Sequence, residues 1–234
     1  MFEYMPKLSV VIPAYKTPER YLKEMLNSIL AQTYENWEIC IADGSPAGES
    51  CERVLKRYAE QDRRFKYVIL GENKGISGNT NAAMDMAAGD FIVLADHDDT
   101  LPPHALYEVV KAINEHPEAD VIYSDEDKMD MDGGALFDPH FKPDFNIDLL
   151  RERQLYLPSV CGQPRSGGQN RRIPPGFDGA QDYDFISGVW SRRDRLPHSQ
   201  GALPLALPPE LYGQQSGEQA LRFRGRFESH YGPL

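Results

Sequence analysis

Residues 91–103 read Phe-Ile-Val-Leu-Ala-Asp-His-Asp-Asp-Thr-Leu-Pro-Pro, and this stretch joins an apolar run to a cluster of carboxylates. The run from Phe91 to Ala95 has no polar interruption, which is typical of a strand buried on both faces of a sheet. In open α/β sheets, ligands bind beside the carboxyl ends of the strands. We therefore predict an α/β fold whose ligand site includes Asp96, Asp98 and Asp99.

Carboxylates placed so close together repel one another unless a cation lies between them. Oxygen-rich groups of aspartates suit Mg²⁺ or Mn²⁺, and these ions in turn hold the phosphates of a substrate. The alternative is a solvated acidic turn that precedes a helix, which Pro102 and Pro103 would begin. Other parts of the sequence have to decide between the two interpretations.

The composition is that of an ordinary globular protein, with 234 residues, 41% hydrophobic and 26% charged. This length accommodates one large α/β domain, or one domain with a small extension. The net charge of −11 argues against nucleic acid as a partner. We expect no membrane span, because no apolar run is long enough, and no signal peptide, because the N-terminus lacks a basic region followed by an apolar core. Three cysteines without metal-ligand spacing favour a reduced, cytoplasmic protein.

Strands and helices alternate on both sides of the opening stretch. Strands are expected at residues 8–12, 37–42, 66–70, 91–95 and 121–124, and helices at 17–30, 49–61, 79–87 and 105–115. The first helix should begin at Thr17 and Pro18, with the threonine hydroxyl as its cap. This alternation indicates βαβ units with a parallel sheet, and the strand ends should lie along one edge. No glycine-rich dinucleotide fingerprint and no P-loop occurs, so phosphates must be held in another way.

Five segments in this order resemble the family 2 glycosyltransferases with the GT-A fold, of the bacterial cell-surface polysaccharide type. They are Ser9–Tyr15, Ala42–Ser45, Glu72–Gly75, Asp96–Asp99 and Tyr123–Asp127. The resemblance implies a Rossmann-like, mostly parallel sheet flanked by helices. It also implies a nucleotide-diphosphate-sugar donor and a DXD motif that binds Mn²⁺ or Mg²⁺.

Carried over position by position, the resemblance implies roles for residues in the donor half. Pro13 and Tyr15 would line the base pocket, and Asp43 would bond the base or ribose. Asn73 and Gly75 would shape the rim of the base pocket, and Asn79 would open the helix that faces it. For Pro13 and Gly75 the alternative is simple turn chemistry, and for Asp43 it is an Asx-turn with Gly44.

The resemblance assigns the metal and the catalytic base to two further segments. Asp96 would reach the ribose or the metal, and Asp98 would bind the metal. An inverting transferase also needs a base that deprotonates the acceptor hydroxyl. The family-like segment Gly176–Asp184 contains Asp182 at the position of that base. Asp178 and Asp184 are its rivals.

The resemblance weakens after residue 150. Residues 1–150 hold 14 Lys and Arg against 28 Asp and Glu, whereas residues 151–234 hold 11 Arg, no Lys and 8 acidic residues. Residues 153–174 and 186–224 lack the family's pattern, while residues 175–185 form a family-like island. Codons for residues 154–162, read one base later, can encode Asn-Tyr-Ile-Cys-His-Leu-Phe-Val, which is family-like. We therefore hypothesise two local frameshifts; a divergent tail is the alternative.

These observations predict a two-part chain. Residues 1–150 would form the nucleotide-sugar-binding half, and residues 151–234 a degraded or irregular acceptor-side segment. The predicted function is metal-dependent, inverting transfer of a sugar to a carbohydrate or lipid-linked glycan acceptor in polysaccharide biosynthesis. We expect a cytoplasmic protein that associates peripherally with the inner face of the membrane. The alternatives are a catalytically impaired nucleotide-sugar-binding module and, less well matched by the sequence, a nucleotidyltransferase.

Overall fold

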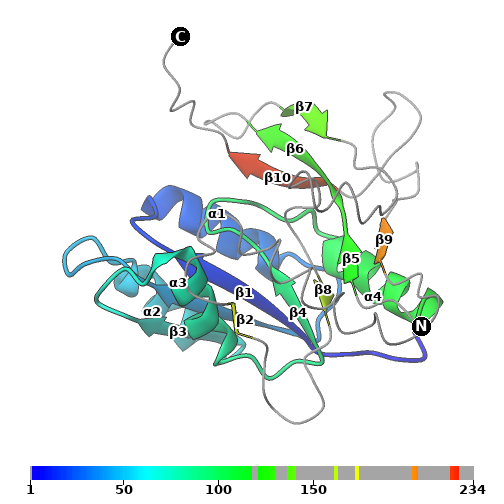
Figure 1. Cartoon of the computed structure of the whole chain (residues 1–234), viewed down its shortest axis with the longest axis horizontal. Helices are drawn as coiled ribbons and strands as arrows, with labels where there is room; N and C mark the ends of the chain where they lie inside the picture. The colour runs from blue at the N-terminus through cyan, green and yellow to red at the C-terminus, as the bar shows by residue number, and fades with distance from the viewer. Residues whose placement is uncertain are drawn as a thin grey trace.

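The computed structural model describes residues 2–117, 121–129, 136–140, 161–162, 172–173, 202–204 and 222–226. Two sheets organise these residues, a seven-stranded sheet in the order β3-β2-β1-β4-β8-β5-β9 and a three-stranded sheet in the order β10-β6-β7 (Figure 1). The strands are β1 (Leu8–Ala14), β2 (Trp37–Asp43), β3 (Phe65–Ile69), β4 (Phe91–Leu94), β5 (Val121–Tyr123), β6 (Asp125–Met129), β7 (Leu136–His140), β8 (Cys161–Gly162), β9 (Ala202–Pro204) and β10 (Arg222–Arg226). The helices are α1 (Glu19–Leu30), α2 (Glu52–Gln61), α3 (Gly75–Met84) and α4 (Ala105–Glu115).

The first four strands of the large sheet are parallel, as the sequence predicted. Leu8 of β1 lies opposite Trp37 of β2 and opposite Phe91 of β4, and β3 pairs with β2 in the same direction. The carboxyl ends of β1 and β4 therefore meet at one edge of the sheet, where ligands bind in open α/β folds. The α/β class with a mostly parallel sheet is confirmed.

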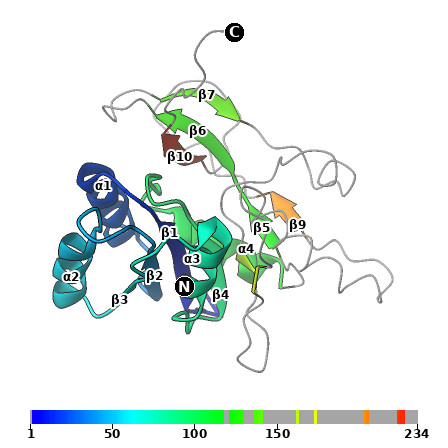
Figure 2. The same cartoon turned by 60° about the vertical axis from the view of Figure 1, so that its left-hand side comes forward.

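Both faces of this sheet are covered by helices, which explains why the strands are mostly apolar on both faces. Val10 and Ile12 of β1 belong to one core cluster, which also contains the apolar faces of α1, α2 and α4. Val11 belongs to the cluster on the opposite face, together with Ala83 and Met84 of α3. Figure 2 shows α3 in front of the sheet, with β1, β2 and β4 behind it. Buried strands of this kind have continuous hydrophobic runs rather than alternation.

The helix starts differ from the predicted ones. α1 begins at Glu19, with Pro18 at its N-cap, and its cap has no side-chain hydrogen bond. The prediction that the Thr17 hydroxyl caps this helix is wrong, because that oxygen is buried and has no hydrogen-bond partner among the described residues. α3 begins at Gly75, four residues before the predicted start at Asn79, because Gly75 itself supplies the turn.

Several stretches after residue 150 take part in the sheets, although the sequence predicted an irregular segment there. β8 is inserted antiparallel between β4 and β5, with Cys161 opposite both Val93 and Ile122. β9 runs parallel to β5, and β10 runs parallel to β6 in the second sheet. Residues 125–127, expected to be a strand end, belong to β6. The polar stretch forms a strand because it pairs with β7 and β10 on its two sides.

Candidate donor-binding site

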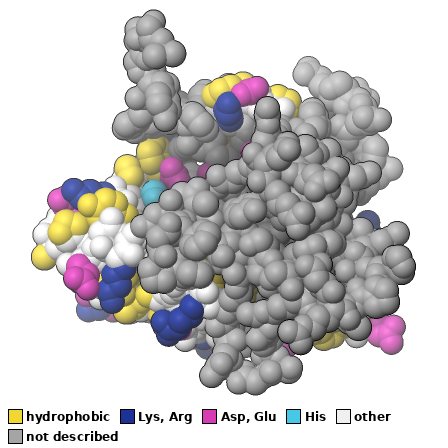
Figure 3. Space-filling model, in the orientation of Figure 1, with side chains coloured by type: hydrophobic (Ala, Val, Ile, Leu, Met, Phe, Trp, Pro, Cys, Tyr) yellow, Lys and Arg dark blue, Asp and Glu magenta, His cyan; other side chains and the backbone are white. Residues whose placement is uncertain are grey.

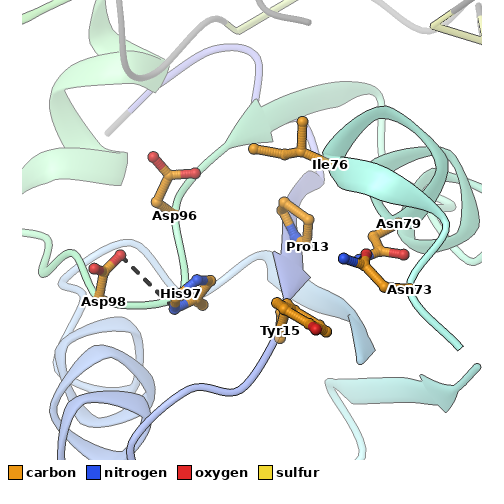
Figure 4. Close-up of a pocket in the computed structure, with 9 residues that line it drawn as sticks. Pro13, Tyr15, Asn73, Ile76, Asn79, Asp96, His97 and Asp98 are labelled. Atoms are coloured by element: carbon orange, nitrogen blue, oxygen red, sulfur yellow. Dashed lines mark hydrogen bonds and ion pairs between the residues drawn. The ribbon is translucent and has the colours of Figure 1, made fainter. Parts of the chain in front are cut away.

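A pocket of about 300 Å³ lies at the carboxyl ends of β1 and β4, beside the start of α3. It is lined by Pro13, Ala14, Tyr15, Asn73, Ile76, Asn79, Asp96, His97 and Asp98. Figure 4 shows the Asp96–Asp98 loop on one side, Asn73 and Asn79 on the other, and Pro13 and Tyr15 between them. Six predicted site residues therefore line one pocket, although they come from three separate segments of the chain.

The end of β1 presents Tyr15 to the pocket by means of a sharp turn. Tyr15 is 39% exposed, and the next residue, Lys16, has a φ of +49°, in the left-handed region. Two contacts hold Lys16: its backbone N–H donates to the Ser45 hydroxyl at 2.7 Å, and its ammonium pairs with Glu49 at 3.0 Å. The Lys16 ammonium also lies 5.6 Å from the centroid of the Tyr15 ring. Tyr15 therefore lines the pocket as a partly exposed aromatic residue.

The start of α3 forms the opposite wall through a pair of asparagines. The Asn73 side-chain oxygen, Oδ1, accepts from the Gly75 N–H at 3.0 Å and from the Asn79 side-chain amide at 3.1 Å. The Asn79 oxygen accepts from the Lys74 N–H at 3.2 Å. Gly75 has a φ of +74°, which favours glycine, and it does not line the pocket. The positive φ and the hydrogen bond to Asn73 therefore agree with the alternative for Gly75, which is a role in the turn.

The close packing of this wall extends to the loop after β2. A Cβ atom on Gly44 would lie 2.6 Å from the Asn79 side-chain nitrogen, so no larger residue fits there without displacing Asn79. Asn79 is only 2% exposed. The glycine next to Asp43 thus serves the packing of the pocket wall.

The loop after β4 gives the pocket its charge. Asp96 and Asp98 flank His97, whose Nδ1 lies 3.7 Å from an Asp98 carboxylate oxygen. Burial of the Asp96 carboxyl, together with the negative charge of Asp98, raises the pKa of Asp96, and His97 opposes this effect. In the space-filling view, acidic side chains and a histidine occur together at the surface of the described part (Figure 3). A cation in the pocket would relieve the repulsion between the two carboxylates.

The fit of a divalent cation can be judged from the groups that the described residues offer. Among them, no cluster of three or more His, Cys, Asp or Glu side chains could enclose a metal ion. The pocket instead presents two carboxylates, Asp96 and Asp98. Mg²⁺ is commonly bound by one or two carboxylates together with substrate phosphates, so the oxygen donors fit a cation that binds with a phosphorylated ligand.

Asp43 does not line the pocket. Its carboxylate is fully buried and accepts three hydrogen bonds, from the Ser45 N–H at 2.9 Å, the Ser50 hydroxyl at 2.8 Å and the Cys51 N–H at 2.8 Å. The bond to Ser45, two residues later, is the Asx-turn that was the alternative for this residue. The contacts of Asp43 therefore favour a structural role over contact with the base or ribose.

The sequence predictions missed some residues that line the pocket. Other predicted residues lie outside the part of the chain that the structure describes. His97, Ile76 and Ala14 line the pocket without having been assigned a role. His97 stands between the two predicted metal ligands, which was a signal available in the sequence. The predicted base Asp182 and its rivals Asp178 and Asp184 lie outside the described residues.

Two relatives are similar over nearly the whole chain. "Uncharacterized protein y4gI" of Sinorhizobium fredii is 43% identical over 232 residues, covering 92% of this chain and 25% of its own length. The O-antigen biosynthesis protein RfbC of Myxococcus xanthus is 30% identical over 220 residues, covering 94% of this chain and 16% of its own length. This chain thus spans a quarter or less of these relatives. At such coverage of this chain, both alignments continue well past residue 150.

Solved structures show the same fold at lower identity. Staphylococcus aureus TarS 1–349 in complex with UDP-GlcNAc has a TM-score of 0.63 and 16% identity, covering 96% of this chain and 60% of TarS 1–349. The mannosyltransferase PcManGT of Pyrobaculum calidifontis, in complex with GDP-Man and Mn²⁺, has a TM-score of 0.55 and 18% identity. The match covers 80% of this chain and 52% of the PcManGT chain. Both likenesses support the GT-A fold.

No helix in the described ranges has the length and apolar character needed to cross a membrane.

The family model for "Glycosyl transferase family 2" matches residues 9–162, which include the three segments that line the pocket. The match covers well over half of the 234 residues. The chain therefore belongs to glycosyl transferase family 2 and has the GT-A fold.

Proposed function

We propose that this chain binds a nucleotide-diphosphate sugar and transfers the sugar, with inversion, to a carbohydrate or lipid-linked glycan acceptor. The observation that carries the proposal is the pocket, which combines an aromatic and apolar wall with two carboxylates. A nucleotide has both features that such a pocket would recognise, a flat base and a charged diphosphate. The UDP-GlcNAc bound to TarS and the GDP-Man and Mn²⁺ bound to PcManGT are ligands of this chemical class.

Each wall of the pocket has a proposed part in binding the donor. Tyr15 and Pro13 would contact the base, and Ile76 of α3 adds a further apolar side chain to the pocket. Asn73 and Asn79 are hydrogen-bonded to one another, and in this arrangement they would shape the rim of the base pocket. Asp98 would hold a divalent cation, and Asp96 would reach the cation or the ribose. The cation, when bound, neutralises charge on the diphosphate leaving group.

The proposed transfer is a single displacement at the anomeric carbon. The acceptor oxygen forms the new bond to this carbon as the bond to the diphosphate oxygen breaks, and the nucleotide diphosphate leaves with the electron pair. The acceptor hydroxyl proton passes to a carboxylate base, for which Asp182 is our candidate. With RfbC named for O-antigen biosynthesis, we propose a cell-surface polysaccharide as the product. A lipid-linked acceptor would bring the protein to the inner face of the membrane.

Substituting Asp98 by Ala tests the proposal. We expect the affinity for UDP or GDP, titrated calorimetrically with Mn²⁺, to fall at least tenfold, because the cation loses a carboxylate ligand. Chelation by EDTA should weaken binding to the unaltered protein and leave the variant unchanged. Asp90→Ala is the matched control, since Asp90 binds the Lys7 N–H at the opposite edge of the sheet. Unchanged affinity in Asp98→Ala would remove the proposed metal role.

The second candidate is a binding module that holds the donor and turns nothing over. It is favoured by the part of the chain after residue 162, where the match to the family model ends. Release of nucleotide diphosphate from a panel of nucleotide sugars separates the two candidates. The enzyme releases it at a rate that rises with acceptor, whereas the module binds donor with Mn²⁺ and releases none.

A further inference from the structure

One side chain of α3 holds a segment that is far away in the sequence. The Asn81 side-chain amide donates to the Ile173 carbonyl oxygen at 2.8 Å, and the Ile173 N–H donates to the Asn81 oxygen at 2.8 Å. Both backbone groups of Ile173 are thereby paired by a single asparagine. This is the pairing that a neighbouring strand would otherwise supply, and it occurs across 92 residues of sequence.

The side chain of Ile173 strengthens this attachment. Ile173 is 2% exposed and belongs to the core cluster beneath α3, with Val11, Leu94 and Met84. The neighbouring Arg172 reaches both oxygens of Asp85 at 2.9 Å, but the two side chains are 69% and 50% exposed. Exposed ion pairs contribute little. The hydrogen bonds of Asn81 and the burial of Ile173 therefore hold the segment.

The attachment point connects the two functional parts of the chain. Asn79, which lines the pocket, lies two residues before Asn81 on the same helix. On the other side, the family-like segment Gly176–Asp184 follows Ile173 almost directly, and the candidate base Asp182 is the ninth residue after it. Nine residues span at most about 30 Å, so an anchor at Ile173 limits where Asp182 can lie.

We propose that Asn81 is a positioning residue that fixes the acceptor-side segment to the helix forming the donor pocket. The inference rests on the proposed function, because it concerns the placement of the base in the same transfer. A catalytic carboxylate must be held to within about 0.5 Å, so its supporting chain needs a fixed origin. Asn81 supplies this origin without contacting the donor itself.

The chain offers a matched control for the loss of such a clamp. Asn114 of α4 binds the backbone of Tyr4 in the same way: its oxygen accepts from the Tyr4 N–H at 3.0 Å, and its amide donates to the Tyr4 carbonyl at 2.8 Å. Neither Tyr4 nor Asn114 lines the pocket. Asn114→Ala therefore removes the same pair of hydrogen bonds, together with a third from the Asn114 amide to the Val110 carbonyl oxygen at 2.8 Å, at a place unrelated to transfer.

Trypsin digestion measures the attachment without relying on activity. The bond between Arg172 and Ile173 is a trypsin site, and its N–H is the one bound by Asn81. In Asn81→Ala, we expect the peptide that begins at Ile173 to appear about ten times faster, as followed by mass spectrometry, because two hydrogen bonds are lost. Asn81→Asp, which keeps the acceptor for the Ile173 N–H, should be intermediate. Asn114→Ala and Asp85→Ala should stay within about twofold of the unaltered chain.

Steady-state kinetics measure positioning. In Asn81→Ala, we expect kcat for nucleotide diphosphate release in the presence of acceptor to fall at least tenfold, with the donor Kd within about twofold. Asn114→Ala should keep both values. Unchanged cleavage and unchanged kcat in Asn81→Ala would overturn the inference while leaving the proposed function intact. If the unaltered chain releases no nucleotide, the proposed transfer fails for this chain, and unchanged trypsin cleavage then still overturns the anchor.

Discussion

Asp43 shows how far the role of one residue depends on its partners. It follows a buried strand in a family-like segment, and its residue type suits contact with a base or a ribose. In the folded chain, however, both carboxylate oxygens accept hydrogen bonds from the next loop and from the start of α2. We therefore propose that Asp43, fully buried and already hydrogen-bonded, mainly stabilises the loop beside the pocket.

Replacing Asp43 by Ala should therefore reduce stability more than binding. We expect the free energy of unfolding, measured with urea, to fall by about 2–4 kcal/mol, because buried donors lose a charged acceptor. Asp62 makes the same short-range bond to the Arg64 N–H at 2.9 Å in a more exposed place, so Asp62→Ala is a control with a smaller loss. A tenfold loss of nucleotide affinity in Asp43→Ala without loss of stability would restore the ligand role.

At the scale of elements, an ionic cluster joins the strands at the edge opposite the pocket. Glu38 of β2 is 1% exposed and accepts from the Ser9 hydroxyl of β1 at 2.8 Å. It also pairs with Lys7 and, at 2.9 Å, with Lys66 of β3. The turn before β4 is included, because the Gly89 N–H donates to the same Ser9 hydroxyl at 2.8 Å. One carboxylate thus connects three strands and the turn that leads into the fourth.

This cluster predicts a particular response to acid. Burial alone would raise the pKa of Glu38, but hydrogen bonds from Lys7, Lys66, Ala88 and Ser9 outweigh it and lower the pKa to about 2, from an ordinary 4.5. Because the folded-state pKa is the lower one, the contribution of Glu38 is complete above pH 4.5 and disappears as the pH falls towards 2. This contribution of Glu38 to the free energy of unfolding is about 3 kcal/mol.

The test compares Glu38→Gln with the unaltered chain by urea unfolding at pH 7 and at pH 3. The difference in unfolding free energy between the two proteins should shrink at pH 3, because the Glu38 carboxyl is then protonated in the unfolded chain but still ionised in the folded one, so folding has to release a proton. Glu108→Gln on α4 is a matched control, because Glu108 is also buried but has a single ion pair of 3.7 Å, with Lys111. An equal difference at both pH values would contradict the role of the Glu38 charge.

At the scale of the whole molecule, the two parts of the chain differ in charge and in pattern. The excess of arginine over lysine after residue 150 and the loss of hydrophobic periodicity led us to hypothesise local frameshifts. The fold nevertheless uses short stretches of this region as β8, β9 and β10, and it seats Ile173 under α3. Backbone pairing explains this in part, because strand ladders are built from groups that every residue except proline carries.

The frameshift hypothesis predicts what the gene will show. Over residues 153–174 and 186–224, we expect another reading frame to encode family-like residues, and DNA sequencing of this region is the measurement. A protein made from the restored frame should unfold at a higher urea concentration, because periodic apolar residues replace an irregular pattern. In that protein, Asp182→Asn should abolish transfer and spare donor binding. Codons that encode no family-like pattern in any frame would refute the hypothesis.

The sequence by itself determined the parallel sheet and most of the pocket. Buried strands need apolar runs, and parallel strands bring their carboxyl ends to one edge, so the strand ends Pro13 and Asp96 could be placed together from local patterns alone. Tyr15, Asn73 and Asn79 were assigned to the site through the resemblance to the family. These features depend on periodicity and chain direction, which a sequence displays directly.

Only the tertiary structure decided which polar groups satisfy one another. The three hydrogen bonds of Asp43, the strands joined by Glu38 and the seat of Ile173 on Asn81 all depend on contacts between residues distant in the chain or on loop geometry. A buried polar group must find a partner, but its residue type does not say which one. The position of each partner is a property of the packed chain, and for that reason these roles became visible only in the fold.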